Sequence, residues 1–88
     1  MEKIYVITET FTREESVWYK NSVCTWTKTS EEAALLLSET LAMKQRLHED
    51  LKVLDYSDEH LHIKFSDEEG KSCYSSWWVR EVKQVPML

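Results

Sequence analysis

Residues 29–49 read TSEEAALLLSETLAMKQRLHE, and this stretch decides the fold. Thr29 and Glu32 have the T-x-x-E spacing of a capping box, with Ser30 as a competing cap. The stretch therefore predicts an amphipathic helix over about residues 30–49. Its expected apolar face consists of residues at steps of three and four: Ala33, Leu36, Leu37, Thr40, Met43, Lys44 and Leu47, widened by Ala34 and Leu41.

The segments on both sides of this helix have the period of two that is typical of strands. In the second expected strand, residues 20–22 form either a bulge or a turn between two short strands. The third has apolar residues on both faces, which predicts a central strand. The only glycine, Gly70, lies in an expected hairpin loop. The five expected strands cover residues 4–12, 17–27, 51–56, 60–65 and 72–85.

The order of these elements is β-β-α-β-β-β, without a linker or a repeat. A sheet with one apolar face needs a second layer to bury that face, and the single helix provides it. We therefore expect an α+β fold, in which residues 1–88 form a single two-layer domain with one helix packed on a mainly antiparallel sheet.

The composition excludes several classes of protein. Apolar residues make up 42% of the chain, with one Gly and one Pro, which argues against disorder. Loops that bind phosphate need several glycines, and no nucleophile motif such as G-x-S-x-G is present. We therefore expect neither an enzyme nor a bound cofactor.

The location of the protein is predicted from its N-terminus, its apolar runs and its cysteines. The N-terminus lacks the pattern of a secretory signal, and the longest apolar run, Ala33–Leu37, is too short to span a membrane. The two cysteines, Cys24 and Cys73, are not in a CxxC pair. We expect a cytoplasmic protein without membrane association, whose cysteines are buried packing residues rather than a disulfide.

The negative charge is concentrated in one segment. Residues 49–69 carry a net charge of -6, whereas the rest of the chain is close to neutral. In an antiparallel arrangement, Glu49 and Asp50 are expected to share one edge of the sheet with Asp67, Glu68 and Glu69. An acidic edge attracts basic surfaces and repels nucleic acid. The alternative explanation is that these residues are ordinary solubilising loops.

The pair Trp77-Trp78 predicts one buried and one exposed indole, because adjacent strand residues point to opposite faces. An exposed face with Trp18 or Tyr19, Trp26 and one member of this pair would suit the stacking of unpaired bases. The acidic net charge argues against such binding, so a nucleic-acid-binding or accessory protein is the alternative expectation, less favoured than a protein-binding module.

His60 and His62 lie on one face of an expected strand, just after Asp58 and Glu59. Two imidazoles and a carboxylate are ligand types that zinc accepts. The alternation with Leu61, Ile63 and Phe65 already explains both histidines as a polar row, and no third ligand follows at a suitable spacing. We therefore expect that the protein has no metal site. The candidate metal ligands that we considered are His60 and His62.

In size, acidity and architecture the chain resembles small bacteriophage or mobile-element proteins that block a host protein. Anti-CRISPR proteins and uracil-DNA glycosylase inhibitors are of this kind, and the likeness concerns overall character, not residue motifs. It implies a non-enzymatic protein-binding module, an anti-defence inhibitor that occupies a basic surface in the host cytoplasm. A homodimer through an exposed edge strand is a further expectation. The expected protein-binding residues are Glu49, Asp50, Asp67, Glu68, Glu69 and Trp78.

Overall fold

Helix α1 is the element that the capping box predicts. In the computed structural model, which describes residues 3–14 and 19–83, α1 spans Ser30–Leu47. The Thr29 hydroxyl oxygen accepts a 3.1 Å hydrogen bond from the backbone amide of Glu32. The helix ends at Leu47 because His48 takes an extended conformation, while its amide still donates to the Lys44 carbonyl.

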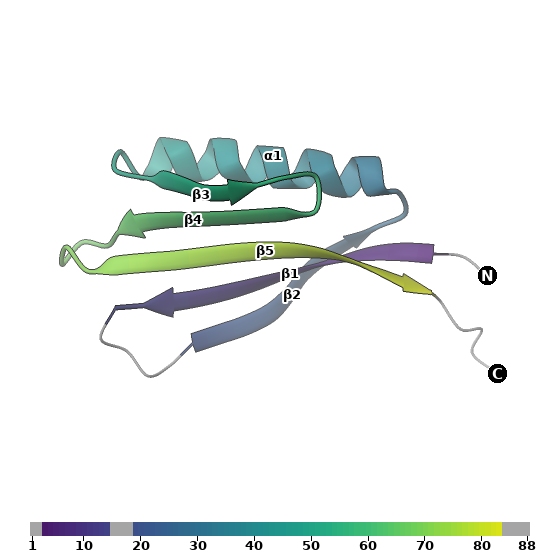
Figure 1. Cartoon of the computed structure of the whole chain (residues 1–88), viewed down its shortest axis with the longest axis horizontal. Coiled ribbons are helices and arrows are strands. Elements are labelled where there is room, and N and C mark those ends of the chain that lie inside the picture. Colours follow the sequence, from purple (N-terminus) through teal and green to yellow (C-terminus); the bar gives the residue numbers. More distant parts are fainter. Residues whose placement is uncertain (1–2, 15–18, 84–88) are drawn as a thin grey trace.

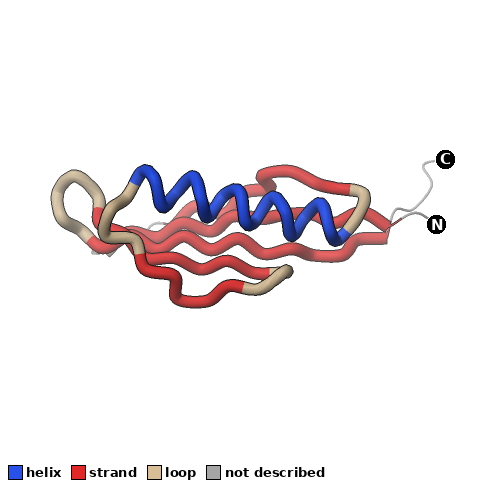
Figure 2. The backbone as a smooth tube through the Cα atoms, turned by 90° about the horizontal axis from the view of Figure 1, so that it is seen from above, coloured by secondary structure: helices blue, strands red, loops and turns tan. Residues whose placement is uncertain are grey.

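Five strands form one antiparallel sheet, and α1 packs on one of its faces. The strands are β1 (Lys3–Arg13), β2 (Tyr19–Thr27), β3 (Lys52–Tyr56), β4 (His60–Ser66) and β5 (Ser72–Lys83). Their order across the sheet is β2-β1-β5-β4-β3. Figure 1 shows the strands with β3 passing in front of α1, and Figure 2 shows α1 running along the sheet. The predicted α+β class and the β-β-α-β-β-β order are confirmed.

The prediction that residues 51–56 form a central strand is wrong. β3 lies at one edge of the sheet, pairs with β4, and is exposed along its whole length. The central strand is β5, which pairs with β1 on one side and with β4 on the other. Val53 and Leu54 are therefore 43% and 49% exposed, since one helix does not extend over every strand of the sheet.

The alternation predicted for β4 and β5 is confirmed. Leu61, Ile63 and Phe65 are buried on the face that α1 covers, and their partners on β5 lie on the same face. Trp77 is 4% exposed and Trp78 is 50% exposed, so Trp78 is the outward-facing member of the pair. The buried core consists of Ile7, Ala33, Leu37, Leu61, Ile63, Phe65, Cys73 and Trp77.

Only part of the predicted apolar stripe of α1 reaches the sheet. Ala33 and Leu37 are fully buried, but Met43 and Leu47 are 48% and 65% exposed, against the prediction. The buried stripe instead follows steps of four residues from Ala33 and Leu37 toward the end of the helix.

Near that end, polar side chains occupy the positions facing the sheet. The Lys44 ammonium lies 5.9 Å from the centre of the Trp77 ring. The His48 ring stacks on Phe65 at 4.0 Å. Lys44 belongs to the predicted face, whereas His48 takes the place that the sequence pattern assigns to Leu47.

Strand β2 shows no interruption at residues 20–22, so neither predicted form of the break occurs there. The bulge falls at Cys24 instead, because Thr25 pairs with Ile7 whereas Val23 pairs with Thr8. The predicted strand residues Val17 and Trp18 lie outside the described residues, as does the last strand beyond Lys83.

Both cysteines are free thiols, and β1 separates their strands. Cys73 is buried, as predicted. Cys24 is exposed, so the prediction of a packing residue is wrong there, because the bulge lies on an edge strand.

The edges of the sheet bear on the expected homodimer. Both β2 and β3 carry a register shift, at Cys24 and at Leu54. Bulges on edge strands disfavour pairing with another chain. The homodimer stays a prediction. Within the described residues, no helix combines the length and the apolar character that a membrane crossing requires.

The register of α1 predicts contrasting effects for two leucines on the same helix. Leu37 is 1% exposed and Leu35 is 57% exposed. We expect Leu37→Ala to lower the free energy of unfolding by about 2–5 kcal/mol, because it leaves a cavity in the core. Leu35→Ala is the matched control and should change it by less than about 0.5 kcal/mol. Urea unfolding measures both, and equal losses would contradict this register.

Candidate functional site

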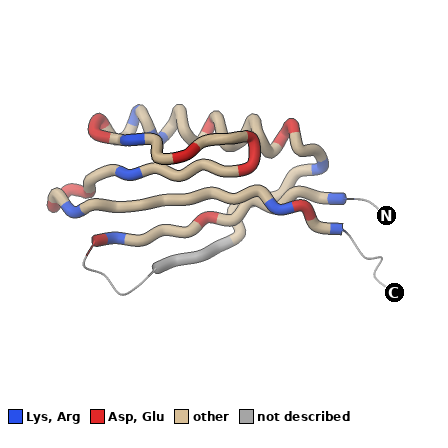
Figure 3. Tube along the Cα trace, in the orientation of Figure 1, with Lys and Arg blue, Asp and Glu red and all other residues tan. Residues whose placement is uncertain are grey.

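The first candidate surface is the acidic end, which we define as Glu49, Asp50, Asp67, Glu68 and Glu69. The loop after α1 and the loop between β4 and β5 lie at the same end of the molecule (Figure 3). Ser66 hydrogen-bonds to Asp50 and thereby lowers the pKa of that carboxyl. This contact ties the two loops together, as the sequence analysis expects.

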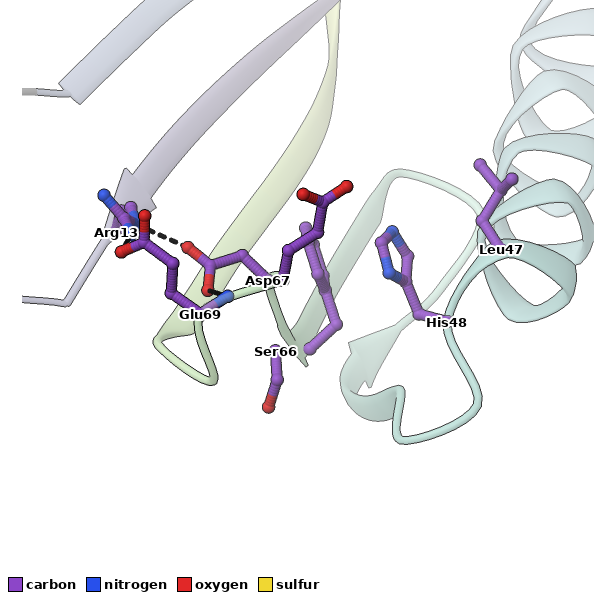
Figure 4. A pocket seen from close by; sticks show the side chains of 8 residues that line it. Arg13, Leu47, His48, Ser66, Asp67 and Glu69 are labelled. Atoms are coloured by element: carbon purple, nitrogen blue, oxygen red, sulfur yellow. Dashed lines mark hydrogen bonds and ion pairs between the residues drawn. The ribbon is translucent and has the colours of Figure 1, made fainter.

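Arg13 lies among these carboxylates and neutralises part of their charge. Its Nε donates to Asp67 at 2.5 Å and its Nη2 donates to Glu69 at 2.7 Å (Figure 4). Arg13 comes from the end of β1, more than 50 residues away in sequence. The acidic end therefore has less uncompensated charge than the sequence indicates. Glu49, Asp50 and Glu68 are its exposed members for which no ion pair is found within the described residues.

Asp67 is chiefly an organiser of the β4–β5 loop. Its Oδ1 accepts hydrogen bonds of 2.9 Å from the amides of Glu69 and Lys71. Gly70 has a φ of 80°, which a residue without a Cβ adopts at little cost. Partial burial raises the Asp67 pKa, but the bonds from Lys71, Arg13 and Glu69 outweigh it, so this pKa lies below its ordinary value of 3.8.

A pocket of about 710 Å³ opens between the acidic end and α1 (Figure 4). The stacked rings of His48 and Phe65 form part of its lining, together with Arg13 and the acidic loop. The pocket thus combines both charge signs with an aromatic wall. A second pocket, of about 600 Å³, lies at the other end of the molecule beside Glu31, Asp58, Glu59 and Glu81.

Trp78 is not part of the acidic end. It pairs with His60 at the beginning of β4, whereas the acidic loop follows Ser66 at the end of β4. Six residues of strand correspond to about 20 Å. The structure therefore brings together five of the six predicted binding residues and places Trp78 on a separate surface.

The second candidate surface is the face of the sheet opposite α1, which we call the open face. The register that buries one set of alternating side chains under α1 directs the other set to this face. Among the residues whose side chains are described, Trp26 and Trp78 are its most exposed aromatic residues, at 55% and 50%. Within the same described set, the aromatic, imidazole and charged residues that the register assigns to it are Trp26, Lys52, Asp55, His60, His62, Lys64, Tyr74, Trp78 and Arg80.

The sign of the charge on the open face is opposite to that of the whole chain. Among strand residues whose side chains are described, it carries the bases Lys52, Lys64 and Arg80 against one carboxylate, Asp55. Lys52 and Lys64 face each other across β3 and β4, and the Lys64 ammonium lies 5.8 Å from the Tyr74 ring centre. Aromatic rings and cations are therefore interleaved on this face.

The candidate metal ligands do not form a metal centre within the described part of the chain. His60 Nδ1 lies 2.8 Å from Asp55 Oδ2, and His60 Nε2 is buried without a hydrogen-bond partner. The rings of His60 and His62 are 5.9 Å apart and tilted. No group of three or more potential ligands comes together among the residues described.

The sequence analysis assigned no functional role to Arg13, Asp55 or the basic residues of the open face. Arg13 lies in a segment that the pattern marks only as a polar connection. The alternation did place Arg80 and Tyr74 on the same face as Trp78. Only the pairing of β3 with β4 adds Lys52 and Asp55 to that face.

Comparison with known proteins gave no match: neither a protein-family model, nor a curated protein, nor a solved structure resembles the chain at significance.

The lowered pKa of Asp67 predicts a pH-dependent contribution to stability. A carboxyl with a depressed folded-state pKa stabilises the fold above its unfolded pKa, and this contribution is lost as pH falls through the folded pKa. Asp67→Asn keeps the loop acceptor but removes the charge that faces Arg13. Its urea midpoint should lie below that of the wild type at about pH 7, and the two should converge as the pH falls well below 3.8, where the wild-type carboxyl is also protonated. Glu68→Gln is the control, and an equal deficit for Asp67→Asn at both pH values would contradict the ionic role.

Proposed function

We propose that the protein is a small non-enzymatic binding module whose open face binds single-stranded nucleic acid. The observation that carries this proposal is the interleaving of exposed Trp26 and Trp78 and half-buried Tyr74 with Lys52 and Lys64 on one uncovered sheet face. Proteins that bind single strands combine stacking aromatic side chains with cations that contact the backbone phosphates.

The local charge supports this proposal despite the net charge of -5. A bound phosphate interacts most strongly with the charges of the surface nearest to it. On the open face, the basic side chains that are described outnumber the carboxylates. Asp55, the carboxylate on that face, is hydrogen-bonded to His60. Carboxylates at the ends of the molecule lower the affinity through longer-range repulsion, which salt screens.

The shape of the surface favours a single strand over a duplex. Bases inside a duplex expose their edges in grooves, which helices and narrow ribbons enter. Unpaired bases expose their flat faces and stack on aromatic side chains that stand on a sheet. The exposed indoles of Trp26 and Trp78 on such a sheet suit unpaired bases.

A direct test uses a fluorescent oligothymidylate of about 12 nucleotides, a length within the range that single-strand modules occupy. We expect anisotropy to report binding at low salt, and Trp78→Ala to weaken it by about tenfold through loss of one stack. Tyr56→Ala is the matched control, because Tyr56 is 46% exposed but pairs with Leu61 on the side of the sheet that faces α1.

The same assay tests the role of the cations. Three phosphate contacts predict a slope of about -2 for the logarithm of the binding constant against the logarithm of salt concentration, and Lys64→Gln should reduce its magnitude by about 0.7. The absence of oligothymidylate binding would overturn the proposal. Equal binding of an oligoglutamate peptide would also contradict it, since charge alone would then account for the interaction.

A second candidate function follows from the acidic end. We propose as the alternative that Glu49, Asp50, Asp67, Glu68 and Glu69 dock on a basic protein surface, as an anti-defence inhibitor from a phage or mobile element would do. The convergence of two acidic loops at one end supports it. The two free thiols agree with action in the cytoplasm, where cysteines stay reduced.

The best residues for testing this alternative are the acidic residues that form no ion pair with Arg13. We expect the double variant Glu49→Lys and Glu68→Lys to slow association with a labelled oligolysine peptide by about tenfold and to weaken its salt dependence. The control is Glu31→Lys with Glu39→Lys, which changes the net charge equally on α1. Equal slowing in both double variants would show that only net charge matters, against a defined acidic site.

A further inference from the structure

Three side chains from three strands form a continuous chain of contacts on the open face. Asp55 on β3 bonds to His60 on β4 at 2.8 Å. The His60 ring stacks on Trp78 of β5, with ring centres 3.7 Å apart and planes inclined by 18°. We call these three residues the Trp78 stack.

His60 is unusually well buried for a residue on an uncovered face. It is 9% exposed, whereas the Trp78 that it contacts is 50% exposed. Because an ionised carboxylate only accepts hydrogen bonds, the bond to Asp55 assigns a proton to His60 Nδ1. Its Nε2 is buried without a hydrogen-bond partner, so the ring has no polar contact on that side.

This arrangement suits a positioning role for His60. Burying a ring nitrogen without a hydrogen-bond partner lowers the stability of the fold. An apolar ring at the same position would pack without that cost. The bond to Asp55 holds the imidazole plane in place, and the imidazole supports one face of the indole. Trp78 is thereby held with one face of its indole against His60.

The stack with His60 covers one face of the indole, and the other face is directed toward β1. On that side the cross-strand neighbour on β1 is Thr8, and the next position on β2 is Val23. Both side chains are small compared with an indole, and β2 lies about 10 Å from β5 across the sheet. A flat group stacked at van der Waals distance on the indole would stand above Thr8.

We infer that the Trp78 stack is a preformed site for one unpaired nucleobase, which stacks on the indole face opposite His60; this inference rests on the proposed nucleic-acid binding. His60 and Asp55 are positioning residues that act through Trp78. A side chain held in its binding orientation loses less conformational entropy when the ligand arrives, which raises affinity.

The surroundings of the stack fit a nucleotide better than a bare aromatic group. Arg80 follows Trp78 by two residues on the same strand and lies on the same face, about 7 Å along β5. Its guanidinium is suited to the phosphate next to a stacked base. Tyr74 lies on this face about 13 Å from Trp78 in the other direction, where it offers a second ring.

The test measures binding of labelled oligothymidylate to variants of His60 and Asp55. We expect His60→Ala to weaken binding by about fivefold, and His60→Phe to stay within about twofold of the wild type because it restores the ring. Asp55→Ala should weaken binding less than His60→Ala. In a Trp78→Ala background, the effect of His60→Ala should disappear, since His60 acts only through the indole.

An oligomer of abasic deoxyribose phosphate provides the control ligand. It keeps the phosphates and lacks the bases, so His60→Ala should leave its weaker binding unchanged. If His60→Ala proves too unstable to purify, the comparison of Asp55→Ala with the wild type and the Trp78→Ala background still decides the question.

The outcomes separate this inference from the proposed function. The base site would be overturned if His60→Ala bound oligothymidylate as tightly as the wild type does. It would also be overturned if His60→Ala lowered the affinity equally in the presence and absence of Trp78. In both cases the proposed nucleic-acid binding would stand. The base site would also be overturned if His60→Phe lowered the affinity for oligothymidylate as much as His60→Ala does, because the support of the indole by an aromatic ring would then not explain the loss. A wild-type protein that binds no oligothymidylate would overturn both.

Discussion

A single helix of 18 residues packs on a five-stranded sheet, and it covers only one of the two faces. The buried core lies between α1 and that face, and it includes Leu37 of the helix together with Leu61 and Ile63 of β4. Because side chains alternate strictly along a strand, every residue between the buried ones points to the opposite face. That face has no second layer within the described chain, so its composition is not constrained by core packing.

The same alternation separates the charges. Carboxylates collect in the loops at both ends. At the acidic end Arg13 compensates Asp67 and Glu69, and the open face carries Lys52, Lys64 and Arg80. The net charge of -5 therefore describes no particular surface of the molecule. A partner responds to the local potential within about 10 Å at moderate salt, so the open face and the acidic end are suited to different kinds of ligand.

Features that depend on neighbouring residues were predictable. The capping box predicted the start of α1, and the alternation predicted the opposite orientations of Trp77 and Trp78. Features that depend on strand order were not. The edge position of β3 follows from the pairing of β1 with β5, which joins the first strand of the chain to the last. No local pattern marks Arg13 as the partner of Asp67, because their contact spans 54 residues.

Local sequence is sufficient for the period of each element and for the capping of the helix, because these depend on backbone geometry and contacts within a few residues. It is also sufficient for the segregation of apolar and polar side chains on β4. The tertiary structure alone decided which face stays uncovered, and it brought Asp55, His60 and Trp78 into one stack. The reason is physical: strand order and register are selected by the burial of the whole apolar face, and residues on three different strands meet only after that selection is made.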